Sequence, residues 1–103
     1  MAIMMVMTWN GVTPDQYQNL REAVDWETEV PAGAIFHVAS HGDGALHVTD
    51  VWEAPDAFDN FVQQRLMPAV QKMGITTQPD VKVYPIQGVF LPHPEKLKSL
   101  ETA

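Results

Sequence analysis

One stretch of the sequence, FHVASHGDGALHVTDVW from Phe36 to Trp52, carries polar side chains that could do chemistry within an apolar pattern. His37 and Asp50 stand out, because a carboxylate can hold one nitrogen of an imidazole ring and leave the other as a base near neutral pH. Such a pair can take a proton from a phenol, an enol or an activated C–H group. Trp52 adds a large flat ring suited to stacking against an aromatic ligand. These residue types indicate proton transfer on an aromatic or enolic small molecule.

The elements that must position this pair are two strands of a hairpin, expected at residues 34–40 and 45–53, because the glycines of HGDG allow a tight turn. If Gly42-Asp43 is the turn, His37 lies opposite Val48 and diagonal to Asp50, roughly 5.5 to 8 Å away at the backbone. A three-residue turn would shift the register by one and change every neighbour. His37 would then share its face with His47, Thr49 and Glu53.

The two-residue turn divides the hairpin side chains between the two faces of the sheet. Phe36, Val38 and Val51 suit the side packed on helices, and Thr49 shares that side. The opposite, open face should carry Ile35, His37, Ala39, Leu46, Val48, Asp50 and Trp52.

Turn and helix signals divide the rest of the chain into four more elements. A strand is expected at 2–9 and a helix from Pro14 to about Trp26, with Thr13 as its N-cap. A second helix starts at Pro55 and should kink or break near Met67, since Pro68 lacks an amide donor. Gly74 ends this helix, and the last strand spans 81–90. The domain therefore covers 1–90 and a C-terminal tail covers 91–103.

The element order βαββαβ, with right-handed crossovers, predicts an α+β ferredoxin-like fold: an antiparallel sheet with two helices on one face. The uncovered face should be polar, yet the first strand is apolar on both sides, with Met5 and Met7 on one and Met4 and Val6 on the other. A second layer must cover this face, and another copy of the chain is the simplest one. We therefore expect a homodimer whose sheets face each other.

Composition excludes several classes of function. The 103 residues include 6 basic and 13 acidic side chains, a net charge of −7, so neither nucleic acid nor an anionic membrane is an expected partner. The chain has no cysteine, which suits a cytoplasmic location, and no stretch of about 18 apolar residues. The chain has no H-E-x-x-H motif and no glycine-rich phosphate loop. We expect neither a metal nor a cofactor.

The segments VTDVWEAPDAFDNFVQQRLMPAV and PAGAIFHVA, together with the element order, resemble the dimeric α+β barrel superfamily, in particular the small bacterial proteins similar to antibiotic biosynthesis monooxygenases. The resemblance covers most of residues 2–90. It implies dimers in which each sheet backs onto its partner's and each subunit encloses one pocket. The strand that ends in Trp52-Glu53, followed by an Ala-Phe helix, is its strongest motif.

The activities of the resembling families diverge, and they include cofactor-free oxygenation of aromatic rings, haem degradation, isomerisation and polyketide cyclisation. The oxygenases line the pocket with the tryptophan found here as Trp52, but where they have an asparagine four residues earlier this chain has Val48. Haem-degrading relatives carry an axial histidine on the second helix, and this helix has none. Cyclases pair a pocket histidine with a tyrosine, roles that His37 and Tyr84 could take.

The function expected from these residues is that of a cofactor-independent enzyme, similar to a monooxygenase or a cyclase. It would act on a hydrophobic, aromatic or polyketide-type small molecule, in a pocket between the sheet and the helices of a dimer. His37 is the expected base and Asp50 orients it. One alternative is a non-catalytic protein that only binds such a ligand, and another is a structural dimer with a filled interior. The expected ligand-binding residues are Trp52, Tyr84, Ile35, Val48 and Trp9.

Overall fold

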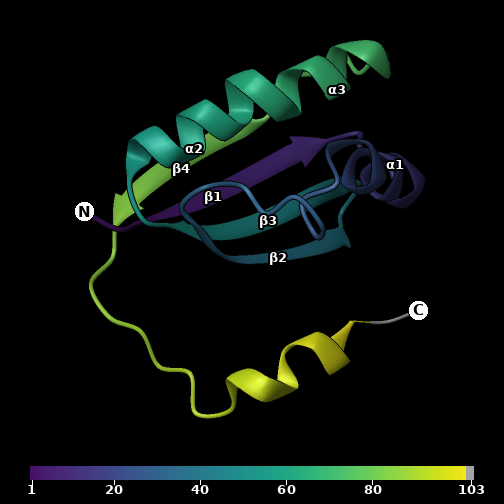
Figure 1. Ribbon diagram of the computed structural model, residues 1–103. Helices are drawn as coiled ribbons and strands as arrows, with labels where there is room; N and C mark the ends of the chain where they lie inside the picture. Colours follow the sequence, from purple (N-terminus) through teal and green to yellow (C-terminus); the bar gives the residue numbers. More distant parts are fainter. Residues whose placement is uncertain (102–103) are drawn as a thin grey trace.

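A four-stranded antiparallel sheet forms the centre of the protein, as seen in a computed structural model that describes residues 1–101 (Figure 1). The strand order is β2-β3-β1-β4. Because the chain leaves β1 through a helix and returns to the sheet two strands away, the topology is the expected ferredoxin-like one. The strands are β1 (Ile3–Asn10), β2 (Ala34–Gly42), β3 (Ala45–Trp52) and β4 (Asp80–Pro85).

The first helix, α1 (Pro14–Val24), begins where the sequence predicts. The Thr13 hydroxyl accepts the Gln16 amide at 3.1 Å, and the Gln16 side chain accepts the Thr13 amide at 3.0 Å. This reciprocal capping box satisfies two amide groups that a helix start leaves unpaired. The helix ends two residues earlier than expected, because Asp25 adopts a left-handed conformation with φ of 56°.

The second helical region consists of α2 (Pro55–Phe61), the π-helical turn η1 (Val62–Leu66) and α3 (Met67–Lys72). The expected interruption before Pro68 is confirmed and takes the form of this wider turn, which accommodates the missing proline amide. No helix in residues 1–101 is both long and apolar enough to cross a membrane.

The hairpin turn lies one residue further along the chain than expected. Asp43 and Gly44 both have positive φ, at 54° and 73°, as a tight hairpin turn of the primed type requires. Gly42 consequently pairs with Ala45, and His37 lies directly opposite Asp50 instead of diagonal to it. The register moves by two residues, so the predicted sets of side chains still share a face.

The helices cover the face that we expected to be open, so that part of the prediction was wrong. Met5 and Met7 of β1 and Trp52 of β3 are buried in one core with Leu20 of α1 and Phe58 of α2. His37 and Asp50 share this inner face. The alternation of apolar residues in β1 is nearly equal on both sides, so the pattern could not decide which side the helices pack on.

The last strand is shorter than the predicted 81–90. Its pairing partner β1 begins at Ile3, which pairs with Pro85, and one further bond joins the Ile86 amide to the Ala2 carbonyl. Beyond this point no β1 backbone remains to pair with, and Phe90 is 86% exposed. Residues 102–103 of the predicted tail lie outside the described residues.

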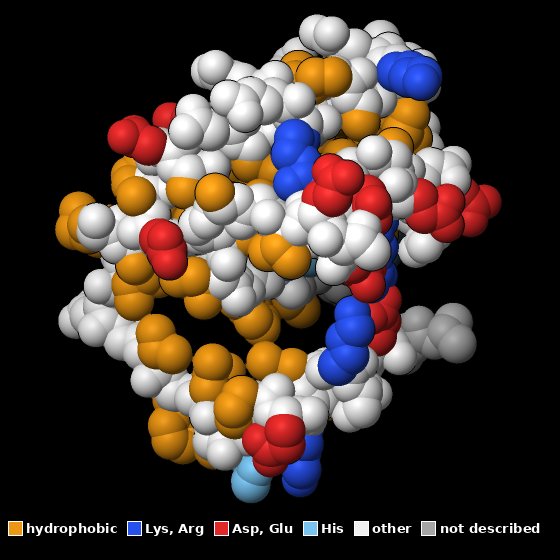
Figure 2. Space-filling model, viewed as in Figure 1, with side chains coloured by type: hydrophobic (Ala, Val, Ile, Leu, Met, Phe, Trp, Pro, Cys, Tyr) orange, Lys and Arg blue, Asp and Glu red, His pale blue; other side chains and the backbone are white. Residues whose placement is uncertain are grey.

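The segment from 86 to 101 leaves the sheet and crosses below it, with two short 3-10 turns, η2 (Pro94–Lys96) and η3 (Lys98–Leu100). We refer to residues 86–101 as the C-terminal arm. Figure 2 shows a hollow between the arm and the body, with hydrophobic side chains along both sides. Arg21 of α1 fixes the far end of the arm through an ion pair with Glu101. The arm therefore forms a loop around an apolar space.

Candidate functional site

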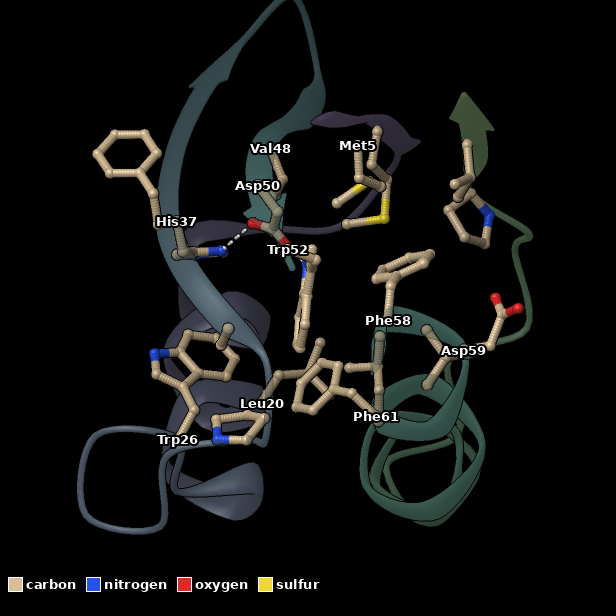
Figure 3. A pocket seen from close by; sticks show the side chains of 18 of the residues that line it. Met5, Leu20, Trp26, His37, Val48, Asp50, Trp52, Phe58, Asp59 and Phe61 are labelled. Carbon is tan, nitrogen blue, oxygen red and sulfur yellow. Dashed lines mark hydrogen bonds and ion pairs between the residues drawn. The ribbon is translucent and has the colours of Figure 1, made fainter. Parts of the chain in front are cut away.

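A cavity of about 320 Å³ lies between the inner face of the sheet and the helices. The sheet provides its floor, and Leu20 of α1 and Phe58 and Phe61 of α2 provide its walls (Figure 3). Its polar lining is sparse: Asp50 and His37 lie on one side and Asp59 on the other. Neither lysine nor arginine is among the described residues that line it.

His37 and Asp50 form the contact that their spacing predicts. Nδ1 of His37 lies 2.6 Å from Oδ1 of Asp50, across the β2–β3 ladder. The Asp50 side chain is only 8% exposed, whereas that of His37 is 32% exposed. The carboxylate is therefore buried inside the protein, and the imidazole is partly accessible to solvent.

Trp52 fixes the second oxygen of the same carboxylate, since its indole Nε1 donates to Oδ2 of Asp50 at 3.1 Å. A carboxylate only accepts hydrogen bonds, so Nδ1 of His37 must be the donor to Oδ1. In the neutral ring this tautomer leaves Nε2 with a free lone pair. Asp50 therefore determines which nitrogen of His37 can accept a proton.

Tyr17 of α1 supplies a third member of this chain, and the sequence analysis did not identify it as a site residue. Its hydroxyl lies 2.8 Å from Nε2 of His37, and the two rings are nearly parallel, with 7° between their planes. Burial raises the pKa of Tyr17 to about 12, although nearby Arg21 acts in the opposite direction. The phenol therefore keeps its proton at neutral pH, and it can donate to Nε2 of His37 when the ring is in the tautomer protonated at Nδ1.

Trp26, just beyond α1, is a second residue that the sequence reasoning missed. Its ring centroid lies 5.0 Å from that of His37 and 6.1 Å from that of Tyr17. Trp26 lines the cavity, and so do the two rings that it contacts. Helix periodicity indicated the inward side of α1, but only the crossing of α1 over β2 brings these aromatic rings onto His37.

Ile35 does not occupy the position expected of it. A β-bulge between Ala34 and Phe36 places Ala34 opposite Trp52 and leaves Ile35 unpaired and 57% exposed, although Ile35 still lines part of the cavity. A regular ladder would have placed Ile35 against Trp52. The small Ala34 side chain leaves room beside the indole ring instead.

The other expected ligand-binding residues divide between the two faces. Val48 and Trp9 are buried and line the cavity, and Trp9 donates from Nε1 to the Thr77 carbonyl at 2.9 Å. Tyr84 was placed wrongly. It pairs with Met4 on the outer face, is 46% exposed and does not line the cavity, because β4 presents its odd-numbered residues to the helices.

The remaining histidines lie away from the cavity. His41 contacts the Val12 carbonyl, His47 contacts the Gly42 carbonyl, and His93 of the C-terminal arm contacts Glu95. Within residues 1–101 no group of three or more histidine, aspartate or glutamate side chains is arranged to hold a metal ion. The hydrogen bonds that join Tyr17, His37 and Asp50 form a chain along which a proton could pass.

Comparison with known proteins shows what fold this chain shares. No family model matches the sequence, and no curated protein matches it. A mutant of SnoaB, a cofactor-independent oxygenase from Streptomyces nogalater, is similar in structure, with a TM-score of 0.66 and 14% identity over 89% of this chain and 98% of that one.

Two further solved structures are similar. A Nitrosomonas europaea protein of unknown function, NE2512, has a TM-score of 0.68 and 13% identity, and covers 89% of this chain and 95% of its own. A Caulobacter crescentus candidate antibiotic biosynthesis monooxygenase has a TM-score of 0.63 and 15% identity, and covers 84% and 91%. The expected resemblance to the dimeric α+β barrel proteins is confirmed at the level of the fold.

Proposed function

We propose that this protein is a cofactor-independent enzyme that removes a proton from an uncharged, hydrophobic, aromatic or enolisable small molecule. The observation that carries the proposal is the hydrogen-bonded chain of Tyr17, His37 and Asp50 at the side of a largely apolar cavity. In this proposal His37 takes up the proton, Asp50 stabilises the imidazolium that results, and Trp52 shapes the pocket. The similarity of the fold to a cofactor-independent oxygenase supports the proposal.

The composition of the cavity supports an uncharged ligand. Two carboxylates, Asp50 and Asp59, line the cavity, with neither lysine nor arginine among its described residues. An anionic ligand would meet negative charge with no cation to pair with, and the loss of its hydration would be uncompensated. Aromatic walls from Trp52, Phe58 and Phe61 favour a flat ring instead.

Deprotonation next to a carbonyl group gives an electron-rich enolate. Such an enolate can react with oxygen or close a ring, so a single proton transfer serves an oxygenase and a cyclase equally. Val48 occupies the position where the resembling oxygenases have an asparagine, and Val48 has no polar atom to bind an oxygen species. Deprotonation is therefore the step assigned to this site, whichever reaction of the enolate follows it.

The test uses 2-tetralone, an uncharged bicyclic aromatic ketone with activated C–H bonds. Exchange of these protons for deuterium, followed by NMR under nitrogen, measures deprotonation whatever reaction follows. We expect the protein to accelerate exchange and His37→Gln to lower the rate by roughly 100-fold or more. His93→Gln, which changes an exposed histidine of the C-terminal arm, is the matched control and should leave the rate unchanged. An equal rate in His37→Gln would exclude His37 from the reaction.

A non-catalytic binding protein is the second candidate, and one observation favours it. Both nitrogens of His37 already have partners, Asp50 and Tyr17, so the site is satisfied without a reaction. A binding protein would melt at a higher temperature with 2-tetralone, yet would not accelerate its exchange. A filled interior is disfavoured, because the cavity reaches the size of about 300 Å³ at which ligand pockets begin.

We also propose that a second copy of the chain covers the outer face of the sheet. No helix from α1 to α3 packs on this face, and its side chains are largely apolar, as a surface that meets another protein would be. Sedimentation should give twice the mass of one chain, and a monomer at all concentrations would exclude the dimer. The face comprises Met4, Val6, Val38, Val51 and Tyr84.

A further inference from the structure

His37 presents no free nitrogen to the cavity. Nδ1 donates to Asp50 at 2.6 Å, and Nε2 accepts from Tyr17 at 2.8 Å. A ligand could therefore reach Nε2 only by displacing the Tyr17 hydroxyl. The Tyr17 oxygen still has lone pairs available, because a hydroxyl donates one hydrogen bond and can accept two.

Tyr17 also holds a defined position. It projects from α1, its ring lies parallel to that of His37, and Trp26 and His41 pack against its other sides with centroids 6.1 and 6.2 Å away. These contacts restrict the rotation of the ring, so its hydroxyl stays within hydrogen-bond distance of Nε2 of His37, and Tyr17 itself lines the cavity. Groups held in place before the reaction need little reorganisation during it.

From this geometry we infer that Tyr17, rather than His37, is the catalytic residue that meets the ligand. This inference rests on the proposed function and assigns a role within it. The Tyr17 oxygen takes the proton of the ligand's C–H or O–H bond while the Tyr17 proton passes to Nε2 of His37. One proton leaves the ligand, one O–H bond of Tyr17 is replaced by another, and the products are the ligand anion and an imidazolium paired with Asp50. Return of the proton follows the same path backwards.

The environment of Tyr17 supports a concerted transfer. Burial raises the pKa of Tyr17 to about 12, so a free phenolate is disfavoured, and in this path none forms. The charged groups that influence the phenol are Arg21, Glu27, Asp50 and Glu101. Only Asp50 bonds to His37, where it stabilises the positive charge that develops on the imidazole.

The first test compares Tyr17→Phe with the wild type in the 2-tetralone exchange assay. Removal of the hydroxyl should lower kcat by roughly 100-fold or more with little change in KM. Tyr84→Phe, which removes the outer-face hydroxyl, is the matched control and should leave both constants unchanged. If His37 meets the ligand directly, Tyr17→Phe will expose Nε2 and the rate will stay equal or rise, which overturns the inference but leaves the proposed function intact.

The second test distinguishes chemistry from packing. In the Tyr84→Phe background Tyr17 is the only tyrosine, so biosynthetic incorporation of 3-fluorotyrosine changes this phenol alone. A more acidic phenol should move the basic limb of the pH–rate profile to lower pH, and a purely structural tyrosine would not move it. An unmoved limb overturns the inference. No acceleration by the wild type, or full activity in His37→Gln, would overturn the proposed function and this assignment with it.

Discussion

The two faces of the sheet are built from alternate residues of the same strands, yet they differ in what they bury. The inner face combines large apolar side chains with one carboxylate, and that carboxylate has a partner on each oxygen. The outer face has largely apolar side chains, and none of the helices α1 to α3 packs on it; of the described residues, only the C-terminal arm crosses on that side (Figure 1). Both faces are hydrophobic, so hydrophobicity does not show which face carries the candidate site. The buried Asp50 carboxylate, with a hydrogen-bond partner on each oxygen, distinguishes the inner face.

The largest effect is expected for Asp50→Asn, which replaces one carboxylate oxygen on the inner face by an amide nitrogen. The amide oxygen can still accept from Trp52, but the amide nitrogen must donate to Nδ1 of His37, so the proton moves to Nε2. Nε2 can then no longer accept from Tyr17. We expect 2-tetralone exchange to fall by roughly 100- to 10,000-fold in a folded protein. Thr49→Val, the isosteric change on the outer face, should leave the exchange rate unchanged.

Adjacent residues of β1 provide a comparison of stability. Met5 is 1% exposed on the inner face, so Met5→Ala should lower the free energy of unfolding by about 2–5 kcal/mol through lost contacts and a cavity. Met4 lies on the outer face, and Met4→Ala should cost a single chain about 1 kcal/mol or less. Urea denaturation measures both. If a second copy covers Met4, the loss of unfolding free energy in Met4→Ala will grow with protein concentration. A loss that is the same at every concentration would contradict coverage of the outer face by a second copy.

The two tyrosines lie on opposite sides of the sheet, and the titration of the buried Tyr17 can be followed by itself. The raised pKa of Tyr17 means that the folded protein favours its neutral phenol. This contribution to stability is complete below pH 10, the ordinary tyrosine value, and is lost as the pH rises from there towards 12. Ultraviolet absorbance of the phenolate should show a step near pH 12 that Tyr17→Phe removes and Tyr84→Phe retains. Loss of that step in Tyr84→Phe would contradict the assignment.

The smallest expected effect concerns the C-terminal arm that spans the outer side. Hydrogen bonds from Arg21 lower the pKa of Glu27 and of Glu101, so these pairs stabilise the arm above the ordinary glutamate value of 4.5 and weaken as the pH falls below it. Exposed pairs contribute little. Glu101→Gln should therefore produce only a slightly faster proteolytic cleavage within the arm. Glu95→Gln, which removes a charge distant from Arg21, should leave cleavage unchanged.

Much of the fold could be predicted from the sequence, because its signals are local. Thr13 and Pro14 specify a helix start, Pro68 an interruption, and the glycines of HGDG a tight turn. Period-two alternation also placed His37 and Asp50 on one face, and it survives a register change of two residues.

The site itself could be predicted only in part. Alternation in β1 gave two almost equally apolar sides, and Phe36, Val38 and Val51 of the hairpin pointed to the wrong side for the helices. Tyr84 was expected to bind the ligand, but it lies on the outer face. The contact of Tyr17 with His37 joins residues on a helix and a strand, and only the crossing of the two elements determines it. Strand periodicity cannot predict such a contact, because it describes the faces of one element and not how two elements pack against each other.

The bulge at Ile35 has a consequence for how the size of the cavity can change in evolution. One additional backbone residue, rather than a choice of side chain, exchanges isoleucine for alanine beside Trp52. Loss of a single codon there would restore regular pairing and shift the residues before it, without touching any member of the proton chain. The bulge affects the space available to a substrate, whereas Tyr17, His37 and Asp50 provide the proposed proton transfer. A descendant could therefore accept smaller or larger molecules while these three residues stayed the same.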